Sequence, residues 1–146
     1  MARLGKSEWS LHLFTDKYRY FNNLYKKTNE YMEISTFFTM KKLKVYIASP
    51  YTIGDTAVNV RRQIDAANEL MDMGLLPFAP LMSHFHHLVH PRSYESWLEW
   101  DFGWLEVCDI VLRLDGESRG ADMEVARAKE LGIPVCYSIN ELEKMI

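Results

Sequence analysis

Glu124 lies in the stretch DGESRGADMEVARA, whose residue types suit the binding of an anion. Gly116 and Gly120 allow the backbone to turn sharply, and Ser118, Arg119 and the first amides of the next helix offer hydrogen-bond donors on one side. An ordinary strand-to-helix turn with Ser and Asp as caps fits the same spacing. We expect Glu124 in the first turn of that helix, either as a carboxylate without a role or as a nucleophile beside the anion.

Asp101 is a second carboxyl group in an informative position. It lies on an apolar helical stripe, four residues after Trp97 and four before Leu105, so we expect its side chain to point inward. A buried carboxyl group needs a partner or a raised pKa. Asp101 is therefore either a core residue satisfied by backbone amides or an acid beside a cleft, and one nucleophilic plus one acidic carboxyl group would suit glycosidic cleavage.

Histidine and tryptophan side chains are concentrated between these two features. The irregular stretch LMSHFHHLVHPRS contains His84, His86, His87 and His90. Imidazole is a common zinc ligand, but the spacing matches no helix-borne zinc motif and no Cys pair lies nearby, so we expect ligand-binding or solvent-facing histidines rather than a metal site. Trp97, Trp100 and Trp104 are read as too closely spaced to share one face, which leaves at least one outside the core to stack on a base.

The first structural unit that positions these residues reads as strand, helix, strand. The apolar run 43–49 predicts a buried strand, and 75–79 predicts a second one. Between them we expect a helix with Asp55 or Thr56 as its N-cap and Gly74 as its stop. The apolar stripe of this helix is expected to contain Val60, Ile64, Ala67 and Met71.

The remainder of the chain repeats the same alternation. After an irregular connection of about a dozen residues, helical spacing resumes at Tyr94 and ends near Cys108. Strands are expected at 109–114 and 133–138, with a helix from Met123 to Leu131 between them and a terminal helical turn in ELEKMI.

This alternation predicts an α/β fold: an open, mostly parallel, doubly wound sheet of four to five strands, Rossmann- or flavodoxin-like, with helices on both faces. Such sheets bind small molecules at the carboxyl ends of their strands. The loops expected there are ASPYTIGDT, APLMSHFHHLVH and DGESRGADME. The unusual residues therefore gather at one edge of the sheet.

Composition narrows the class of protein. The chain has 146 residues, of which 48% are hydrophobic and 25% charged, as expected for a single core. A net charge of −3 argues against nucleic-acid binding through the overall field. No apolar run could cross a membrane and no signal peptide is evident, so we expect a cytoplasmic protein. Cys108 and Cys136 lie in apolar surroundings and are expected to stay reduced.

Residues 1–40 differ from residues 41–146. They hold six Lys or Arg against four Asp or Glu, and nine of the 19 aromatic residues, whereas residues 41–146 hold 11 against 16. We interpret residues 1–40 as an N-terminal extension, partly helical or disordered, or even a misplaced start before Met40. A catalytic domain is expected at 41–146, and it should fold and act after deletion of residues 1–39, unless the N-terminal aromatic residues belong to its core or cover its site.

Three blocks of the sequence together resemble the nucleoside 2-deoxyribosyltransferase family, which includes the 2'-deoxynucleoside 5'-phosphate N-hydrolases. The blocks are VYIASPY, LEWDFGWLEVCDIVLRL and SRGADMEVARAKELGIPV. The resemblance implies that Glu124 attacks the anomeric carbon of the sugar, that Tyr46 orients Glu124, and that Asp101 hydrogen-bonds the base and helps it leave. Ser118 matches the serine with which the nucleotide hydrolases hold the 5'-phosphate. Ser49 and Asp122 stand where the family more often has glycine.

The reaction implied is hydrolysis of a nucleoside 5'-monophosphate through a covalent glycosyl-Glu intermediate, without a metal or organic cofactor. The residues expected to bind substrate are Ser49, Pro50, Tyr51, Ser118, Arg119, Gly120, His84, His86 and Trp97. A base-exchanging deoxyribosyltransferase and a non-catalytic nucleotide-binding module are the alternatives. The resemblance also implies a homodimer or higher homo-oligomer.

Overall fold

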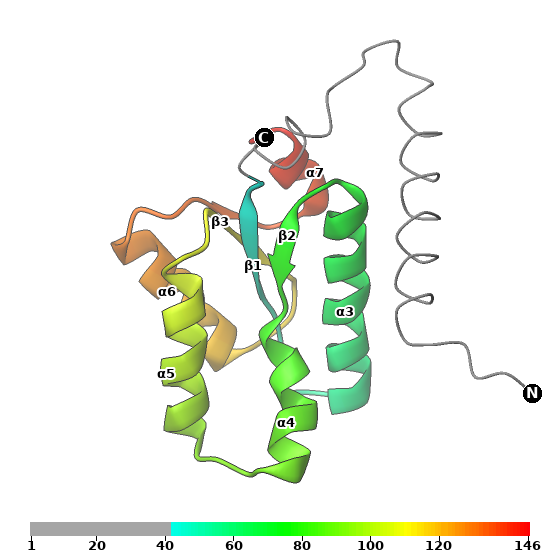
Figure 1. Cartoon of the computed structure of the whole chain (residues 1–146), viewed down its shortest axis with the longest axis vertical. Coiled ribbons are helices and arrows are strands. Elements are labelled where there is room, and N and C mark those ends of the chain that lie inside the picture. The colour runs from blue at the N-terminus through cyan, green and yellow to red at the C-terminus, as the bar shows by residue number, and fades with distance from the viewer. Residues whose placement is uncertain (1–41) are drawn as a thin grey trace, which may run out of the picture. The chain divides into compact units, whose positions relative to one another are not determined.

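The computed structural model describes residues 42–146. The interpretation of residues 1–40 as an extension therefore lies outside the described residues. The described part (Figure 1) has strands separated by one or more helices, where η1 is a short 3-10 helix. The order is β1 (Lys44–Ala48), α3 (Thr56–Asp72), β2 (Leu76–Phe78), η1 (Pro80–Met82), α4 (Ser83–Val89), α5 (Tyr94–Leu105), β3 (Ile110–Arg113), α6 (Arg119–Glu130), β4 (Val135–Cys136) and α7 (Ile139–Glu143).

The described strands form a four-stranded sheet in which every neighbouring pair is parallel. The strand order is β2-β1-β3-β4, so β1 and β3 are central. In the register of the sheet, Tyr46 lies beside Phe78 on one side and Val111 on the other. The expected open, parallel α/β sheet with four strands is confirmed, and its carboxyl edge is where the loops after β1, β2 and β3 begin.

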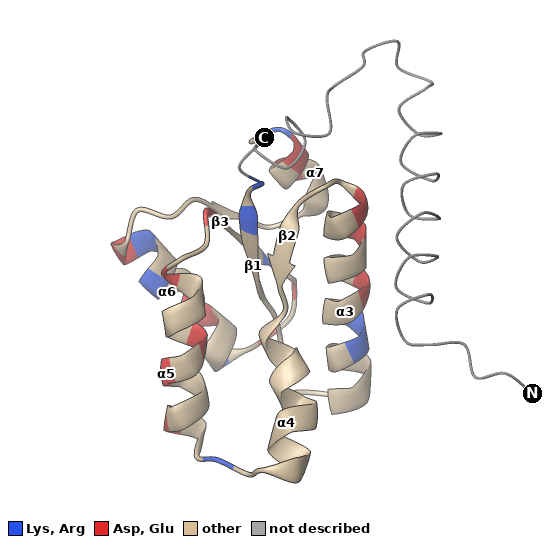
Figure 2. Ribbon diagram, in the orientation of Figure 1, with Lys and Arg blue, Asp and Glu red and all other residues tan. Residues whose placement is uncertain are grey.

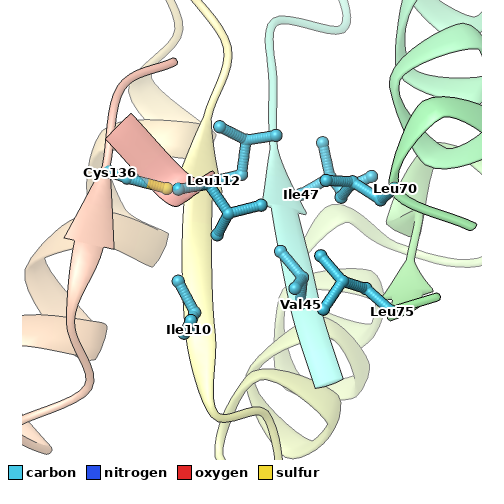
Figure 3. Close-up of a cluster of buried hydrophobic side chains, with 8 residues drawn as sticks. Val45, Ile47, Leu70, Leu75, Ile110, Leu112 and Cys136 are labelled. Atoms are coloured by element: carbon cyan, nitrogen blue, oxygen red, sulfur yellow. The ribbon is translucent and has the colours of Figure 1, made fainter. Parts of the chain in front are cut away.

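Helices cover both faces of the sheet and bury an apolar cluster on each. Figure 1 shows α3 on one side of the strands and α5 and α6 on the other. Figure 3 shows the α3 side, where the buried cluster consists of Val45, Ile47, Leu70, Leu75, Ile110, Leu112, Cys136 and Leu142. The cluster on the α5 and α6 side consists of Tyr46, Ala48, Leu105, Cys108, Val111, Ala121 and Ala128. Each fully buried Leu or Ile contributes about 1.5–3 kcal/mol to folding.

The expected apolar stripe of α3 is partly wrong. Ile64 and Met71 are exposed, whereas the buried residues are Val60, Gln63, Ala66 and Leu70. The buried face follows positions 60, 63, 66 and 70 because Gln63, a polar residue, occupies a core position. The caps agree with expectation: the Asp55 side chain accepts hydrogen bonds from the amides of Ala57 and Val58, and Gly74 has a positive φ of 81° just past the helix end.

Two further expectations differ from the structure. The stretch after Pro80, read as irregular, forms η1 and α4; α4 buries none of its side chains, so it has no apolar period to reveal it. Helix α6 begins at Arg119 rather than Met123, since Ser118 caps it. Glu124 therefore lies in the second turn of α6, not the first.

Acidic residues predominate on the surface of two helices. Figure 2 shows the positions of acidic residues along α5 and along the C-terminal part of α3, and of basic residues nearer the N-terminus of α3. Helix α5 contains Glu95, Glu99 and Asp101 and no Lys or Arg. Cys108 and Cys136 are free thiols on opposite faces of the sheet. None of the helices in residues 42–146 is long and apolar enough to cross a membrane.

Candidate functional site

The centre of the site is a buried hydrogen bond between a strand and a helix. Side chains alternate along β1, so Tyr46 points to the α6 side of the sheet while Val45 and Ile47 point to the α3 side. The Tyr46 hydroxyl donates to Oε1 of Glu124 at 2.7 Å, and Tyr46 and Glu124 are 0% and 7% exposed. This bond fixes one carboxylate oxygen and leaves the other available for chemistry.

Asp101 joins this pair from α5, which packs against α6. Within residues 42–146, its Oδ1 is the buried side-chain polar atom that has no hydrogen-bond partner. A buried acceptor without a donor costs free energy, which a ligand N–H or a proton on the carboxyl group would relieve. The expectation that α5 turns this side chain inward agrees with the burial of its Oδ1 atom.

Burial raises the pKa values of all three groups, and neighbouring negative charges add to the increase for Glu124 and Tyr46. The pKa of Glu124 is raised to about 8: burial is the largest cause and the charge of Asp101 adds to it, while the Tyr46 hydrogen bond and the Arg113 charge oppose the increase. Burial raises the pKa of Asp101 to about 7. Burial, then the charges of Glu124 and Asp101, raise the pKa of Tyr46 well above its ordinary value, so the phenol stays a donor. The two carboxyl groups can thus share one proton near neutral pH.

The loop after β3 is tightly built. Gly116 adopts a φ of +111°, and a Cβ there would lie 2.9 Å from Cγ of Pro50, so the loops after β1 and β3 are in close contact. Ser118 caps α6 by accepting from the amide of Ala121 at 3.2 Å. At Gly120 a Cβ would lie 3.5 Å from the Tyr94 hydroxyl, which brings the start of α5 to the same place.

Three arginines surround this loop, and two of them are paired with acidic residues, one in the loop and one in α6. Arg62 of α3 pairs with Asp115 and also donates to its carbonyl oxygen at 3.0 Å. Arg113 pairs with Asp122 at 3.0 Å. Arg119 is exposed and forms none of the ion pairs found in residues 42–146. Arg119 is therefore the cation that an incoming anion would meet first.

Ser49 faces away from the carboxyl pair. Its hydroxyl accepts a hydrogen bond at 2.8 Å from Nε2 of Gln63, which also donates to the carbonyl of Ile47. The Oε1 atom of Gln63 accepts from the amide of Leu81. Gln63, which the sequence interpretation did not single out, thus ties α3 to the end of β1 and to η1. The Ser49 side chain serves this network on the α3 side.

Replacing Gln63 with Leu should lower the free energy of unfolding by about 2–4 kcal/mol, because it removes two buried hydrogen bonds and one part-buried one and leaves their partners unsatisfied. Urea denaturation of residues 1–146 measures this. Asn68→Leu, on an exposed position of the same helix, is the matched control and should change stability by less than about 0.5 kcal/mol. Equal effects of the two substitutions would contradict this role for Gln63.

Helix α4 is connected to the site through imidazole contacts. The Tyr51 hydroxyl and Nδ1 of His84 are 2.9 Å apart, which links the loop after β1 to α4. The Trp97 indole donates to Nδ1 of His87 at 2.8 Å, which links α4 to α5. The ring of His86 meets Trp97 edge-on. The expected ligand-binding residues of the histidine stretch therefore lie against Tyr51 and Trp97. In residues 42–146, no group of His, Cys, Asp and Glu is arranged to hold a metal ion.

The tryptophans of α5 form a row, contrary to the expectation that they cannot share a face. Spacings of three and four residues place them on one side of a helix. The ring of Trp100 meets both Trp97 and Trp104 edge-on, and Trp104 stacks on Phe78 at 5.1 Å. Trp100 and Trp104 are partly exposed, as expected for at least one of them. Phe78 in turn contacts the ring of Tyr46, so aromatic surface extends from the carboxyl pair.

Comparisons with known proteins agree with this fold. Among solved structures, the chain is similar to the 2-deoxyribosyltransferase of the psychrotolerant bacterium Bacillus psychrosaccharolyticus, with 25% sequence identity and a TM-score of 0.50 over 63% of this chain and 69% of that one. No curated protein matches the chain. Residues 43–138 match the model of a family described as a domain of unknown function, DUF7768. The chain therefore belongs to the DUF7768 family, a group of domains whose function is not established.

Proposed function

We propose that this protein cleaves the N-glycosidic bond of a nucleoside 5'-monophosphate, releasing the free base and the sugar phosphate. The observation that carries the proposal is the group formed by buried Tyr46 and Glu124 with half-buried Asp101, in which two carboxyl groups have raised pKa values and one phenol donates a hydrogen bond. Similarity to a 2-deoxyribosyltransferase supports chemistry at a nucleoside. The sequence blocks that resemble this family contain the same three residues.

In the proposed first step, the ionised Glu124 attacks C1' of the sugar. The C1'–N bond breaks, its electron pair leaves with the base, and Asp101 supplies a proton to the departing nitrogen. The Tyr46 hydrogen bond holds one oxygen of Glu124 so that the other can reach the sugar. In the second step, water attacks C1', the ester bond to Glu124 breaks, and the deprotonated Asp101 takes the proton of that water.

The position of the shared proton decides whether the roles can be divided in this way. The pKa of Glu124, about 8, exceeds that of Asp101, about 7, so without substrate the proton resides mainly on Glu124, and substrate binding must favour its transfer to Asp101. Glu124 must be ionised and Asp101 protonated at the moment of attack, and their mutual repulsion disfavours the state in which both are charged. Of the two states with one proton, the one that places it on Asp101 is the reactive one. A base bound through an N–H to Oδ1 of Asp101 would also satisfy that unpartnered oxygen.

The phosphate is proposed to bind at the start of α6. Helix N-termini favour anions. Ser118 and Gly120 lie there, together with Arg119, whose charge is not neutralised by the acidic residues of the loop. Pro50, packed against Gly116, holds the loop after β1 close by.

Base exchange is the second candidate, because the similar structure is that of a transferase. In that reaction a second base replaces water in the second step, and the intermediate on Glu124 is the same. Assembly into a homodimer or larger homo-oligomer, implied by the resemblance, stays a prediction.

The decisive experiment is incubation of the full chain with a panel of ribo- and deoxyribonucleosides and their 5'-monophosphates, followed by chromatography for free base. Release from a monophosphate supports the proposal. Release from no member of the panel would refute it. Addition of a second base in excess distinguishes the two candidates, since a transferase gives an exchanged nucleoside or nucleotide at a rate comparable to hydrolysis.

Arg119→Ala should raise KM for a 5'-monophosphate about tenfold while leaving KM for the matching nucleoside almost unchanged. The reason is that a charge-assisted hydrogen bond to phosphate contributes about 1.5–3 kcal/mol and only the monophosphate can form it. Arg61→Ala, which removes an exposed arginine from α3, is the control and should change neither KM. An equal change for both substrates would argue against the phosphate site at Arg119.

A further inference from the structure

Arg113 is a buried cation that the chemistry described so far leaves without a role. It is the last residue of β3 and is 7% exposed, although arginine is rarely buried unless paired. Side chains alternate along β3, and Ile110 and Leu112 face α3, so Arg113 faces the same side as Tyr46. Its guanidinium group is therefore on the side of the sheet where Glu124 lies.

The guanidinium group connects the loop after β3 to the start of α6. It donates to the carbonyl oxygens of Leu114 and Gly116, the latter at 2.8 Å, and to Oδ1 of Asp122 at 3.0 Å. Asp122 lies in the first turn of α6, two residues before Glu124. A planar group with several fixed donors is suited to holding such a set of oxygens in one geometry.

Neighbouring contacts make this geometry specific. Gly116 adopts a conformation that other residues avoid and packs against Pro50, so the loop has little freedom to adjust if its carbonyl loses its donor. The groups whose charges act on Glu124 are Asp101 and Arg113, together with the hydrogen bond from Tyr46. Arg113 is the one cation among them.

We propose that Arg113 is a positioning residue of the site, which holds the loop from Leu114 to Gly116 and the first turn of α6 so that Glu124 faces the substrate. This proposal rests on the proposed function. It assigns to one buried arginine both the shape of the loop from Leu114 to Gly116, which leads to the proposed phosphate site, and the placement of the nucleophile. Arg113 itself need not touch the substrate.

Three variants separate charge from geometry. Arg113→Met removes both, Arg113→Lys keeps the charge but not the fork of donors, and Asp122→Asn breaks the ion pair at an exposed carboxylate, where the fold should tolerate the change. Glu130→Gln, the same type of substitution at an exposed ion pair on α6, is the matched control.

Two readouts are required. The first is the titration of the Glu124 carboxyl carbon by NMR without substrate, which should move to higher pH in Arg113→Met, stay close to wild type in Arg113→Lys, and move to lower pH in Asp122→Asn. The second is base release: kcat should fall about 10- to 100-fold in both Arg113 variants, because displacement of a catalytic group by about 1 Å has effects of this size. The KM of these variants for the nucleoside should stay close to the wild-type value.

The outcomes are distinguishable from failure of the proposed function. If wild type releases no base, the proposed function fails, while the titration still decides whether Arg113 acts on Glu124. If base is released but the kcat of Arg113→Lys equals that of the Glu130→Gln control, Arg113 has no positioning role. Should Arg113→Met fail to fold, Arg113→Lys and Asp122→Asn carry the same test.

Discussion

Glu124→Gln is expected to lower the rate of base release by about a thousandfold or more, which is the usual effect of removing a nucleophile. The amide keeps the size of the side chain and can still accept the hydrogen bond from Tyr46, so the change removes the negative charge with little loss of packing. Chromatographic measurement of free base under single-turnover conditions, with the best substrate of the panel, gives the rate of the first step.

A shorter variant adds a positive test of the same role. Glu124→Ala should be equally inactive, but azide at high concentration should restore release of the base. Azide attacks C1' in place of the carboxylate, which gives a glycosyl azide and free base. Glu130→Gln, an exposed carboxylate on the same helix, should retain the wild-type rate. Wild-type turnover by Glu124→Gln would exclude Glu124 as the nucleophile, whatever reaction the protein catalyses.

The fold could be predicted where burial leaves a pattern in the sequence. Strand β1 is an apolar run because both of its faces are covered, and Asp55 and Gly74 mark the ends of α3 through local hydrogen bonding and backbone conformation. Helix α4 could not be predicted in this way because none of its side chains is buried. What holds it are contacts such as the one between Tyr51 and His84, 33 residues apart, which no periodicity indicates.

The residues of the site likewise divide into those that the sequence indicates and those that it does not. Residue type and the resemblance both point to Asp101 and Glu124, whereas the resemblance alone points to Tyr46. The structure brings Tyr46 and Glu124 into contact across 78 residues. Gln63 and Arg113 were missed because a sequence pattern treats a polar residue as exposed. In the structure these two residues are satisfied mainly by backbone groups of distant or irregular segments, so the signal for them exists only in three dimensions.

The start of α6 illustrates why boundaries are difficult. Gly116 and Gly120 both read as turn residues, but only Gly116 adopts a positive φ, and Gly120 is helical. The side chain of Ser118 supplies the N-terminal cap that allows the helix to include a glycine. As a consequence, Glu124 lies in the second turn of α6 rather than the first. There it contacts Tyr46 of the sheet instead of the loop that precedes α6.

The burial of Glu124 predicts a pH-dependent cost to stability. A folded-state pKa of about 8, against an ordinary value of 4.5, means that the folded protein binds a proton that the unfolded chain has released across this interval. Stability therefore falls as pH rises from about 4.5 to about 8 and is lowest above it. The two values correspond to a penalty on the order of 5 kcal/mol at pH 9, and to less than about 1 kcal/mol at pH 5.

Glu124→Gln removes this titration, so it should stabilise the protein at pH 9 by several kcal/mol and have little effect at pH 5. Urea denaturation of the wild type and the variant at the two pH values gives the difference, in which titrations common to both proteins cancel. Glu130→Gln, whose carboxylate is exposed, should show the same small difference at both pH values. A pH-independent difference for Glu124→Gln would mean that Glu124 ionises normally in the folded protein. The expected result, an inactive variant more stable than the wild type, would show that burial of this carboxyl group is maintained against a stability cost, as catalytic groups often are.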